Sequence, residues 1–273
     1  MNTKPYSIFF IFGWLFLFGF VPLGCIFLLS FLTNDQAHMA TLPWTFHNYT
    51  ELMTPSFSKI LWRSTLMAST TTLLCLLLAY PLSYIIVKSK HQTLWLFLII
   101  IPFWTSSLIR IYSLIAILKI HGILNTLLIK LHIISHPIAF LYSNFAVICG
   151  MVYNLLPFMV LPIFSNMERF DFCLLEAAQD LGASRLIVFF KVFLPNTFSG
   201  IVVGSLMVFL PSMTLFYIPD ILGGARSVLL GNLIQQQFLG AENWPQGAAT
   251  SMLITIIFTL VLCFHRPNQG VVS

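Results

Sequence analysis

Charged side chains are scarce in this sequence. Only 8% of the 273 residues are charged, 58% are hydrophobic, and the mean hydropathy is +0.92. Soluble domains carry roughly 25% charged residues, so the composition excludes an ordinary soluble protein and predicts a membrane protein. The net charge of +5 comes from side chains scattered between apolar runs. Because no basic stripe is present to hold a phosphate backbone, the sequence argues against a nucleic-acid partner.

Cysteine and histidine form no pattern that a metal or disulfide framework needs. The five cysteines include no C-x-x-C pair, and most lie within apolar runs, where cysteine is a small buried hydrophobe. His132 and His136 are four residues apart and share a helix face, but no third ligand lies nearby. We therefore expect no metal site.

Two catalytic signatures are also missing. The sequence has no glycine-rich phosphate loop of the Walker type and no G-x-S-x-G nucleophile elbow. We expect that the chain is not an enzyme and holds no cofactor of its own.

Apolar runs, in contrast, are abundant. A helix needs about 20 apolar residues to cross the hydrocarbon core of a membrane, and six runs predict an all-α, polytopic bundle with six spans. The first run is too long for the apolar core of a signal peptide, about 7 to 15 residues, so we expect an uncleaved span. The runs cover residues 7–32, 62–87, 93–117, 144–164, 196–218 and 246–264.

Three connecting segments have a different character. Residues 33–61 are polar and predict an extramembrane loop, whereas 119–143 is amphipathic and predicts an interfacial helix along the membrane surface. Residues 219–245 contain four glycines and several amide side chains, and predict a short helix with turns on the same side as 33–61.

Prolines inside the predicted spans each remove a backbone donor and predict a kink or a break. Bent spans suit a protein that opens alternately to two sides. The alternative is that proline is simply more frequent in membrane helices than in soluble ones. These prolines are Pro81, Pro102, Pro157, Pro162 and Pro211.

One loop, residues 165–195 between the fourth and fifth predicted spans, concentrates the charge that the spans lack; we refer to it as the charged loop. Asp171 is placed to cap a short helix, the spacing of apolar and small residues is helical as far as Leu181, and Gly182 can close the helix in a left-handed turn. Ser184 then begins a second helix that leads through Pro195 into the fifth span. The charged residues are Glu168, Arg169, Asp171, Glu176, Asp180, Arg185 and Lys191.

Two short helices that meet at a glycine predict a rigid surface element. The small Ala177 and Ala178 allow a groove of another protein to approach the backbone closely. Glu176 and Asp180 are four residues apart, and like charges at this spacing repel slightly, which favours a cationic partner. The alternative is an ordinary amphipathic surface helix.

The charged loop resembles the EAA motif of ABC importer permeases. It keeps the motif's residue types and spacing, with Val192 where isoleucine is usual: Glu176, Ala177, Ala178, Gly182, Val192, Leu194 and Pro195. The resemblance implies that this loop is the coupling helix that sits in a cleft of a cytoplasmic ATPase dimer. The implied coupling residues are Glu176, Ala177, Ala178, Asp180, Gly182, Leu194 and Pro195.

The same resemblance implies a topology. The motif is cytoplasmic in the family, which places both termini of a six-span chain in the cytoplasm, a point that the lysine and arginine distribution alone does not decide. It also implies the type I (MetI-like) importer permease fold. Residues 1–58 are then an N-terminal helix with a periplasmic loop, and 59–266 are the permease domain.

Five further stretches resemble B-type permeases of spermidine/putrescine importers. The resemblance implies a subunit of the bacterial inner membrane, surrounded by membrane lipid, that forms a heterodimer with a second homologous permease. It also implies a periplasmic polyamine-binding protein, and a partner ATPase that binds ATP and Mg. The stretches are IPFWTSSLIRIYSL from Ile101, GMVYNLLPFMVLPIFSNME from Gly150, LPSMTLFYIPDILGGA from Leu210, GNLIQQQFL from Gly231 and WPQGAATS from Trp244.

A polyamine is a flexible cation with several charges, so its path needs carboxylates and aromatic faces. Asp220 is the first candidate, because it follows a charge-free stretch from 192 to 219 and lies three residues after Tyr217. The alternative is that Asp220 only begins the following loop. Glu242 and Trp244 are further candidates at the outer end of the sixth span, although tryptophan is also a common interface anchor.

Three residues of the third predicted span also bear on this path. Trp104 and Tyr112 flank a polar turn and are placed to line it. Arg110 would repel a cation, so we expect it at the membrane interface or paired with a carboxylate.

Other functions stay open from the sequence. The permease of an iron complex or an amino acid derivative would share the EAA motif. An ion-driven secondary transporter would use carboxylates in broken helices and internal repeats, and no repeat is visible here. A membrane scaffold without a transport path is the third class.

Overall fold

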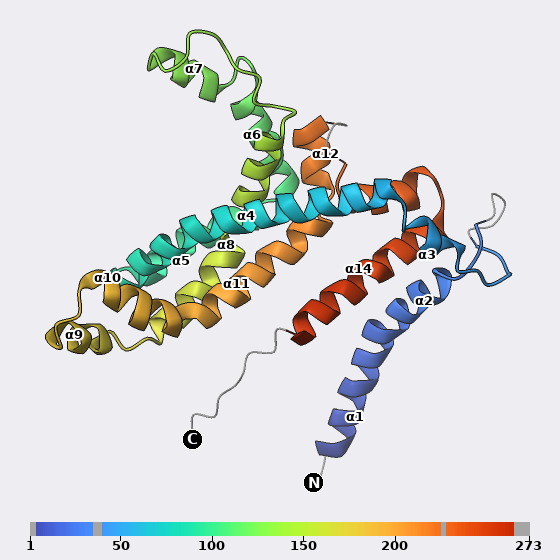
Figure 1. The fold of residues 1–273 in the computed structure, drawn as a ribbon, viewed down its shortest axis with the longest axis horizontal. Helices are drawn as coiled ribbons and strands as arrows, with labels where there is room; N and C mark the ends of the chain where they lie inside the picture. The colour runs from blue at the N-terminus through green and yellow to red at the C-terminus, as the bar shows by residue number, and fades with distance from the viewer. Residues whose placement is uncertain (1–3, 35–39, 225–227, 265–273) are drawn as a thin grey trace. The chain divides into compact units, whose positions relative to one another are not determined.

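The computed structural model describes residues 4–34, 40–224 and 228–264, and these residues form helices joined by turns (Figure 1). Their only β-type pairing is an isolated antiparallel bridge between Thr33 and Thr41. The all-α prediction is confirmed for this part of the chain. The ends of the chain, and with them the last residues of the predicted permease domain, lie outside the described residues.

The chain divides into two compact units, residues 61–232 and residues 1–60 with 233–273. Five helical stretches among the described residues are long and apolar enough to cross a membrane: Phe10–Leu29, Pro55–Lys88, Ser107–Lys130, Asn144–Glu168 and Arg185–Thr214. The sixth predicted span corresponds to α14 (Trp244–Phe264). The coarse expectation of a polytopic helical protein is therefore met.

The larger unit is built around α8 (Asn144–Glu168) and α11 (Leu194–Thr214), which pack side by side. Glycines on α11 allow this close approach: a Cβ at Gly200 would lie 3.0 Å from the carbonyl oxygen of Pro162, and one at Gly204 would lie 2.8 Å from the sulfur of Met159. Inside a membrane the hydrophobic effect does not drive helices together, so they associate through close van der Waals packing, which small residues at the interface allow.

Two buried clusters fill the larger unit. One joins α4 (Pro55–Lys88) to α8 and α11 through residues such as Ile86, Met159 and Val208. The other joins α6 (Ser107–Leu118) to α8 and α12 (Tyr217–Gly223) through Ile111 and Leu222. The two clusters together pack the helices of the larger unit that carry candidate residues.

The predicted third span is not one helix, which corrects the expectation for residues 93–117. It consists of α5 (Gln92–Ile100), the 3-10 helix η2 (Ile101–Trp104) and α6, separated at Thr105, whose backbone is extended. Pro102 lacks an N–H donor, and the Thr105 hydroxyl donates to its carbonyl oxygen at 2.6 Å. Among the five prolines, only this one lies at a break, because α4, α8 and α11 run through the other four.

The fifth span also differs from the prediction of 196–218. Its helical run starts earlier, with α10 (Arg185–Val188) and the π-helix η3 (Phe189–Phe193), and α11 ends at Thr214. Leu215 is extended (φ −61°, ψ 126°), and α12 follows. This break separates Tyr217 from the predicted span and places it in the same short helix as Asp220.

Residues 119–143 contain a shorter helix than predicted, α7 (Ile123–Lys130). The buried Asn125 of α7 holds the following chain against this helix. The Asn125 amide donates to the Ile138 carbonyl at 2.8 Å, and the Asn125 oxygen accepts from the Ile138 N–H at 3.0 Å. Residues 219–245 contain the predicted helix and turns, with α13 (Leu230–Gln235) and the π-helix η5 (Gln236–Gly240) following α12.

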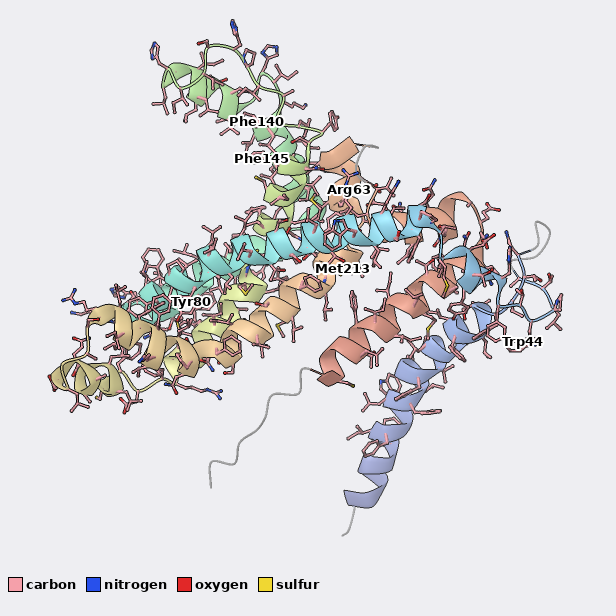
Figure 2. All side chains as sticks on the ribbon, in the orientation of Figure 1. Trp44, Arg63, Tyr80, Phe140, Phe145 and Met213 are labelled. Carbon is pink, nitrogen blue, oxygen red and sulfur yellow. The ribbon has the colours of Figure 1, made fainter. Side chains whose placement is uncertain are left out.

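The smaller unit contains the first span, formed by α1 (Lys4–Leu15), η1 (Phe16–Phe20) and α2 (Val21–Leu29). In this unit α14 packs on α2 and on α3 (His47–Glu51). The aromatic and aliphatic side chains of residues 10–28 are largely exposed (Figure 2). An apolar surface of this extent suits contact with lipid.

Candidate functional site

The charged loop folds as its sequence predicts. It contains α9 (Cys173–Asp180) and α10, and the Asp171 carboxylate accepts the N–H of Cys173 at 3.0 Å. The N-cap itself is Phe172, so Asp171 lies one residue earlier than a helix cap, but its bond still satisfies a free N–H at the start of the helix. The same carboxylate raises the pKa of the exposed Cys173 thiol, by hydrogen bonding and by its charge.

The predicted left-handed turn is also confirmed. Gly182 has a φ of +85°, and its N–H donates to the carbonyl of Gln179 at 2.8 Å, while that of Ala183 donates to the carbonyl of Ala178 at 3.1 Å. These two bonds form a Schellman motif, which closes α9 and turns the chain. Ser184 is then the N-cap of α10, as expected.

The outer surface of the charged loop is uncovered. No residue of α9 is buried, and Glu176, Ala177 and Asp180 are all exposed. Leu181 is 89% exposed and Leu186 is 72% exposed. Two carboxylates beside large exposed apolar side chains form a surface suited to a protein partner rather than to water alone.

The inner surface of the charged loop is fastened by aromatic rings. Phe193 is buried and makes edge contacts with Phe170 at 5.3 Å and with Tyr84 of α4 at 5.5 Å. Phe172, the N-cap of α9, lies edge-on to Phe170 at 5.4 Å. These rings join the charged loop to α4. A structural role for these rings was not predicted, although phenylalanine is frequent between residues 170 and 193.

The implied coupling residues at the end of the motif lie in the adjoining helix. Leu194 is half-buried and Pro195 is exposed, and both lie in the first turn of α11, directly after the π-helix η3. The continuous run from Arg185 to Thr214 connects the loop to the core of the larger unit.

Asp220 lies in the first turn of α12 and is exposed, so it does not merely begin a loop. Its carboxylate accepts a short hydrogen bond from the amide of Asn232. That amide also donates to the carbonyl of Phe216 at 2.9 Å, and the Asn232 oxygen accepts from the N–H of Leu229 at 3.2 Å. Asn232 thus fixes the position of the carboxylate.

Tyr217 is brought into the same region, one helical turn before Asp220. Its hydroxyl accepts from the amide of Asn154 on α8 at 2.9 Å. Asn154 is 7% exposed, and its own oxygen has no hydrogen-bond partner. A buried acceptor without a partner is costly and is suited to receive an N–H donor. The sequence analysis missed Asn154 and Asn232; a lone asparagine inside an apolar span was the available signal for the first.

Trp104 and Tyr112 are placed apart from this pair. They are 79% and 61% exposed, at the end of η2 and on α6. Among the described residues, neither makes a hydrogen bond or ring contact with Tyr217 or Asp220. Their role in a path stays a prediction.

Glu242 and Trp244 belong to the smaller unit. Glu242 is exposed in a left-handed conformation (φ 50°) just before α14, and the Trp244 ring lies edge-on to Phe238 at 5.5 Å. A second carboxylate lies beside the first turn of α14: Glu51 accepts from the Gln246 amide at 3.1 Å and lies 3.0 Å from Nε2 of His47.

Arg110 makes no ion pair with a carboxylate among the described residues. It is 8% exposed, and its guanidinium carbon lies 4.2 Å from the ring centre of Phe103 and 5.8 Å from that of Tyr153. Its Nε and Nη1 atoms have no hydrogen-bond partner. Aromatic faces stabilise this cation in place of a carboxylate, a long-range arrangement that the sequence spacing does not show.

Gly231 precedes Asn232, and its backbone lies close to the backbone of Thr214. A substitution at Gly231 therefore tests the packing that holds Asn232 beside Asp220. A Cβ at Gly231 would lie 2.2 Å from the carbonyl oxygen of Thr214. Gly231→Ala is expected to destabilise the protein by about 1–3 kcal/mol, measured as a lower thermal unfolding midpoint in detergent. Gly24→Ala is the matched control, because Gly24 has open space around it and alanine favours the helix. Equal midpoints for both variants would contradict the close approach.

The described residues contain no group of three or more His, Cys, Asp or Glu side chains able to hold a metal ion.

No family model matches the chain. Two curated relatives are similar over nearly their whole length: the spermidine/putrescine transport system permease protein PotB of Haemophilus influenzae, 45% identical over 95% of this chain and 92% of the relative, and that of Escherichia coli, 48% identical over 93% of each. Among solved structures, a bacterial ABC transporter involved in alginate import matches with a TM-score of 0.75 at 15% identity, over 95% of this chain and 92% of the other.

Proposed function

The chain belongs to the family of spermidine/putrescine transport permeases, and we propose that it forms one half of the polyamine path of an ATP-driven importer in the bacterial inner membrane. The observation that supports this is the similarity to PotB at 45–48% identity over more than nine tenths of the chain. The alginate transporter match adds the fold of an ABC importer permease. Charge scarcity and the long apolar helices agree with a multi-pass membrane protein.

We infer six spans in the type I (MetI-like) arrangement, with α5, η2 and α6 together forming the third and α14 the sixth. Both termini are then cytoplasmic, and residues 1–58 precede a permease domain of 59–266. The positive residues of the tight turn after α4, Lys88 and Lys90, support this orientation, because short cytoplasmic loops favour lysine and arginine.

The charged loop is the proposed contact with the ATPase. The exposed Glu176 and Asp180 of α9, with the exposed Leu181 and Leu186, offer a surface for another chain, and the aromatic inner side of the loop connects it to α4 and α11. Closure of an ATPase dimer on ATP and Mg would displace the loop, and the rings around Phe193 would pass the displacement to the spans. Because this chain has no nucleotide-binding motif, ATP must be hydrolysed by a separate subunit.

The Asp220 region is the proposed contact with the polyamine. The carboxylate offsets the desolvation of one ammonium group, the Tyr217 ring offers a face to it, and the unpartnered oxygen of Asn154 accepts a further N–H. A second homologous permease supplies the other half of the path, and a periplasmic polyamine-binding protein delivers the substrate. Trp104, Tyr112, Glu242 and Trp244 are secondary candidates for the same path.

The test is ATP-dependent uptake of labelled spermidine by proteoliposomes that contain the reconstituted complex. Unlabelled spermidine and putrescine are expected to abolish uptake of the label, whereas amino acids and iron complexes leave it unchanged. Competition by an amino acid instead of the amines would show a permease for another solute. Uptake that depends on an ion gradient and not on ATP would indicate a secondary transporter.

A further inference from the structure

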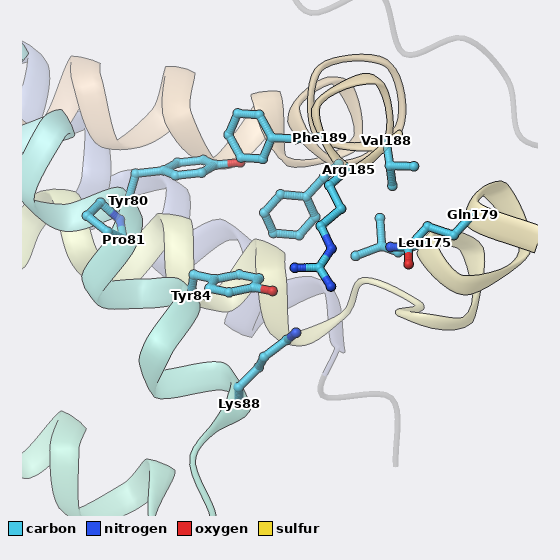
Figure 3. Close-up of a pocket in the computed structure, with 10 residues that line it drawn as sticks. Tyr80, Pro81, Tyr84, Lys88, Leu175, Gln179, Arg185, Val188 and Phe189 are labelled. Atoms are coloured by element: carbon cyan, nitrogen blue, oxygen red, sulfur yellow. The ribbon is translucent and has the colours of Figure 1, made fainter. Parts of the chain in front are cut away.

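A cavity of about 610 Å³ lies in the larger unit where the end of α4 meets the charged loop (Figure 3). Its mouth carries Lys88, the last residue of α4, and Arg185, the first residue of α10. Figure 3 shows both side chains directed into the cavity, near the hydroxyl end of Tyr84. Neither cation has a part in the polyamine contact or the ATPase contact proposed above.

The two cations have no counter-charge in the part of the chain that the structure describes. No carboxylate lines the cavity, and none lies within salt-bridge distance of Lys88 or Arg185. Lys88 instead stands over the rings of Tyr84, at 4.7 Å from the centre, and Phe172, at 5.6 Å. Two like charges that converge on one cavity repel each other, and an anion between them removes this cost.

Most of the other lining residues are apolar or aromatic. Tyr80 lies eight residues before Lys88 on α4, about 12 Å along the helix axis, and Phe193 lies eight residues after Arg185. The Tyr80 hydroxyl is bonded to Thr197 at 3.0 Å, which leaves its ring to the cavity wall. The rest of the lining consists of Pro81, Val188 and Phe189, with Leu175 and Gln179 from α9.

Two cations beside an apolar and aromatic lining, at the ends of two helices long enough to span a membrane, are complementary to a phospholipid: the cations suit its phosphate and the rings suit its acyl chain. We propose that this cavity binds the head group of an anionic phospholipid, with the phosphate between Lys88 and Arg185 and the start of an acyl chain along Tyr80, Pro81 and Phe193. Basic pockets between spans on the cytoplasmic side are suited to such head groups. The apolar and aromatic lining beside the two cations favours a lipid over a free phosphate and over a carboxylate side chain of a protein partner.

Lipid binding is tested on the full chain in nanodiscs of phosphatidylcholine with a minor share of phosphatidylglycerol, by native mass spectrometry of the lipid retained after release. Lys88→Gln and Arg185→Gln are each expected to weaken retention of phosphatidylglycerol about fivefold, and the double variant about 30-fold. Lys90→Gln is the matched control, since it removes one exposed cation of the same turn that does not line the cavity. It should retain the lipid as the unchanged chain does.

Three outcomes would overturn the proposal. Equal loss in Lys90→Gln would show attraction of lipid to the whole basic surface. Full retention in the double variant would place the lipid elsewhere. Retention of inorganic phosphate by detergent-solubilised protein, abolished in the double variant while lipid retention is not, would assign the cations to a free anion. Because the assay measures binding without ATP or polyamine, its failure would leave the proposed transport function untouched.

Discussion

Replacing Glu176 with lysine is expected to reduce ATP-dependent spermidine uptake about 100-fold. Glu176 is exposed in the first turn of α9 and makes no ion pair with a described residue, so the change should not unfold the chain. If the carboxylate docks against a cationic site of the ATPase, reversing its charge costs about 3 kcal/mol of docking free energy, which corresponds to that loss of affinity. The measurement is uptake together with copurification of the ATPase.

Glu168→Lys is the matched control for this experiment. It makes the same charge change at an exposed residue that ends α8, outside α9 and α10. Its uptake and copurification are expected to stay close to those of the unchanged complex. If the Glu176 variant imports spermidine and retains the ATPase normally, the docking role of the charged loop is wrong.

Cys173 offers a direct footprint of the same contact. It is exposed at the start of α9, and the neighbouring Asp171 raises the pKa of its thiol, so maleimide labelling, which needs the thiolate, is expected to be slow near neutral pH and faster toward alkaline pH. In a variant that keeps only this cysteine, added ATPase should protect the thiol. The Glu176→Lys substitution should remove that protection.

Replacing Asp220 with asparagine is expected to lower spermidine uptake about 30-fold. The measured quantity is the initial uptake rate divided by the spermidine concentration. The substitution keeps size and the contact with Asn232 but removes the charge, and a hydrogen bond to a charged group contributes about 2 kcal/mol. Asp220→Glu should restore part of the rate. ATPase copurification should not change, because the charged loop is intact.

The control for Asp220 is Glu242→Gln, the same loss of charge at an exposed residue of the smaller unit. Its effect is expected to be less than that of the Asp220 change. An unchanged rate in Asp220→Asn, with an unchanged thermal unfolding midpoint, would remove Asp220 from the path. A lowered midpoint in the same variant would indicate that the carboxylate serves chiefly to hold Asn232.

Short-range features were predictable because they depend on neighbouring residues. The turn at Gly182, the Asp171 bond at the start of α9 and the helix start after Ser184 are all settled within a few residues. The helical class followed from the apolar runs, since a backbone in lipid must satisfy its own hydrogen bonds. The breaks at Thr105 and Leu215 were not predictable from length and hydropathy, because proline marks both broken and continuous spans in this chain.

Composition and residue pattern were enough to predict a helical membrane protein whose charge is concentrated in residues 165–195, in a loop that resembles an ATPase-coupling motif. The side chains that accompany the candidates became visible only in the folded chain: Asn154 reaches Tyr217 across 63 residues of sequence, Asn232 holds Asp220, and the guanidinium of Arg110 lies over the rings of Phe103 and Tyr153. The fold also brought Lys88 and Arg185 to one cavity. The physical reason is that helix geometry and capping are local, whereas the partners of buried polar groups are chosen by the packing of distant helices.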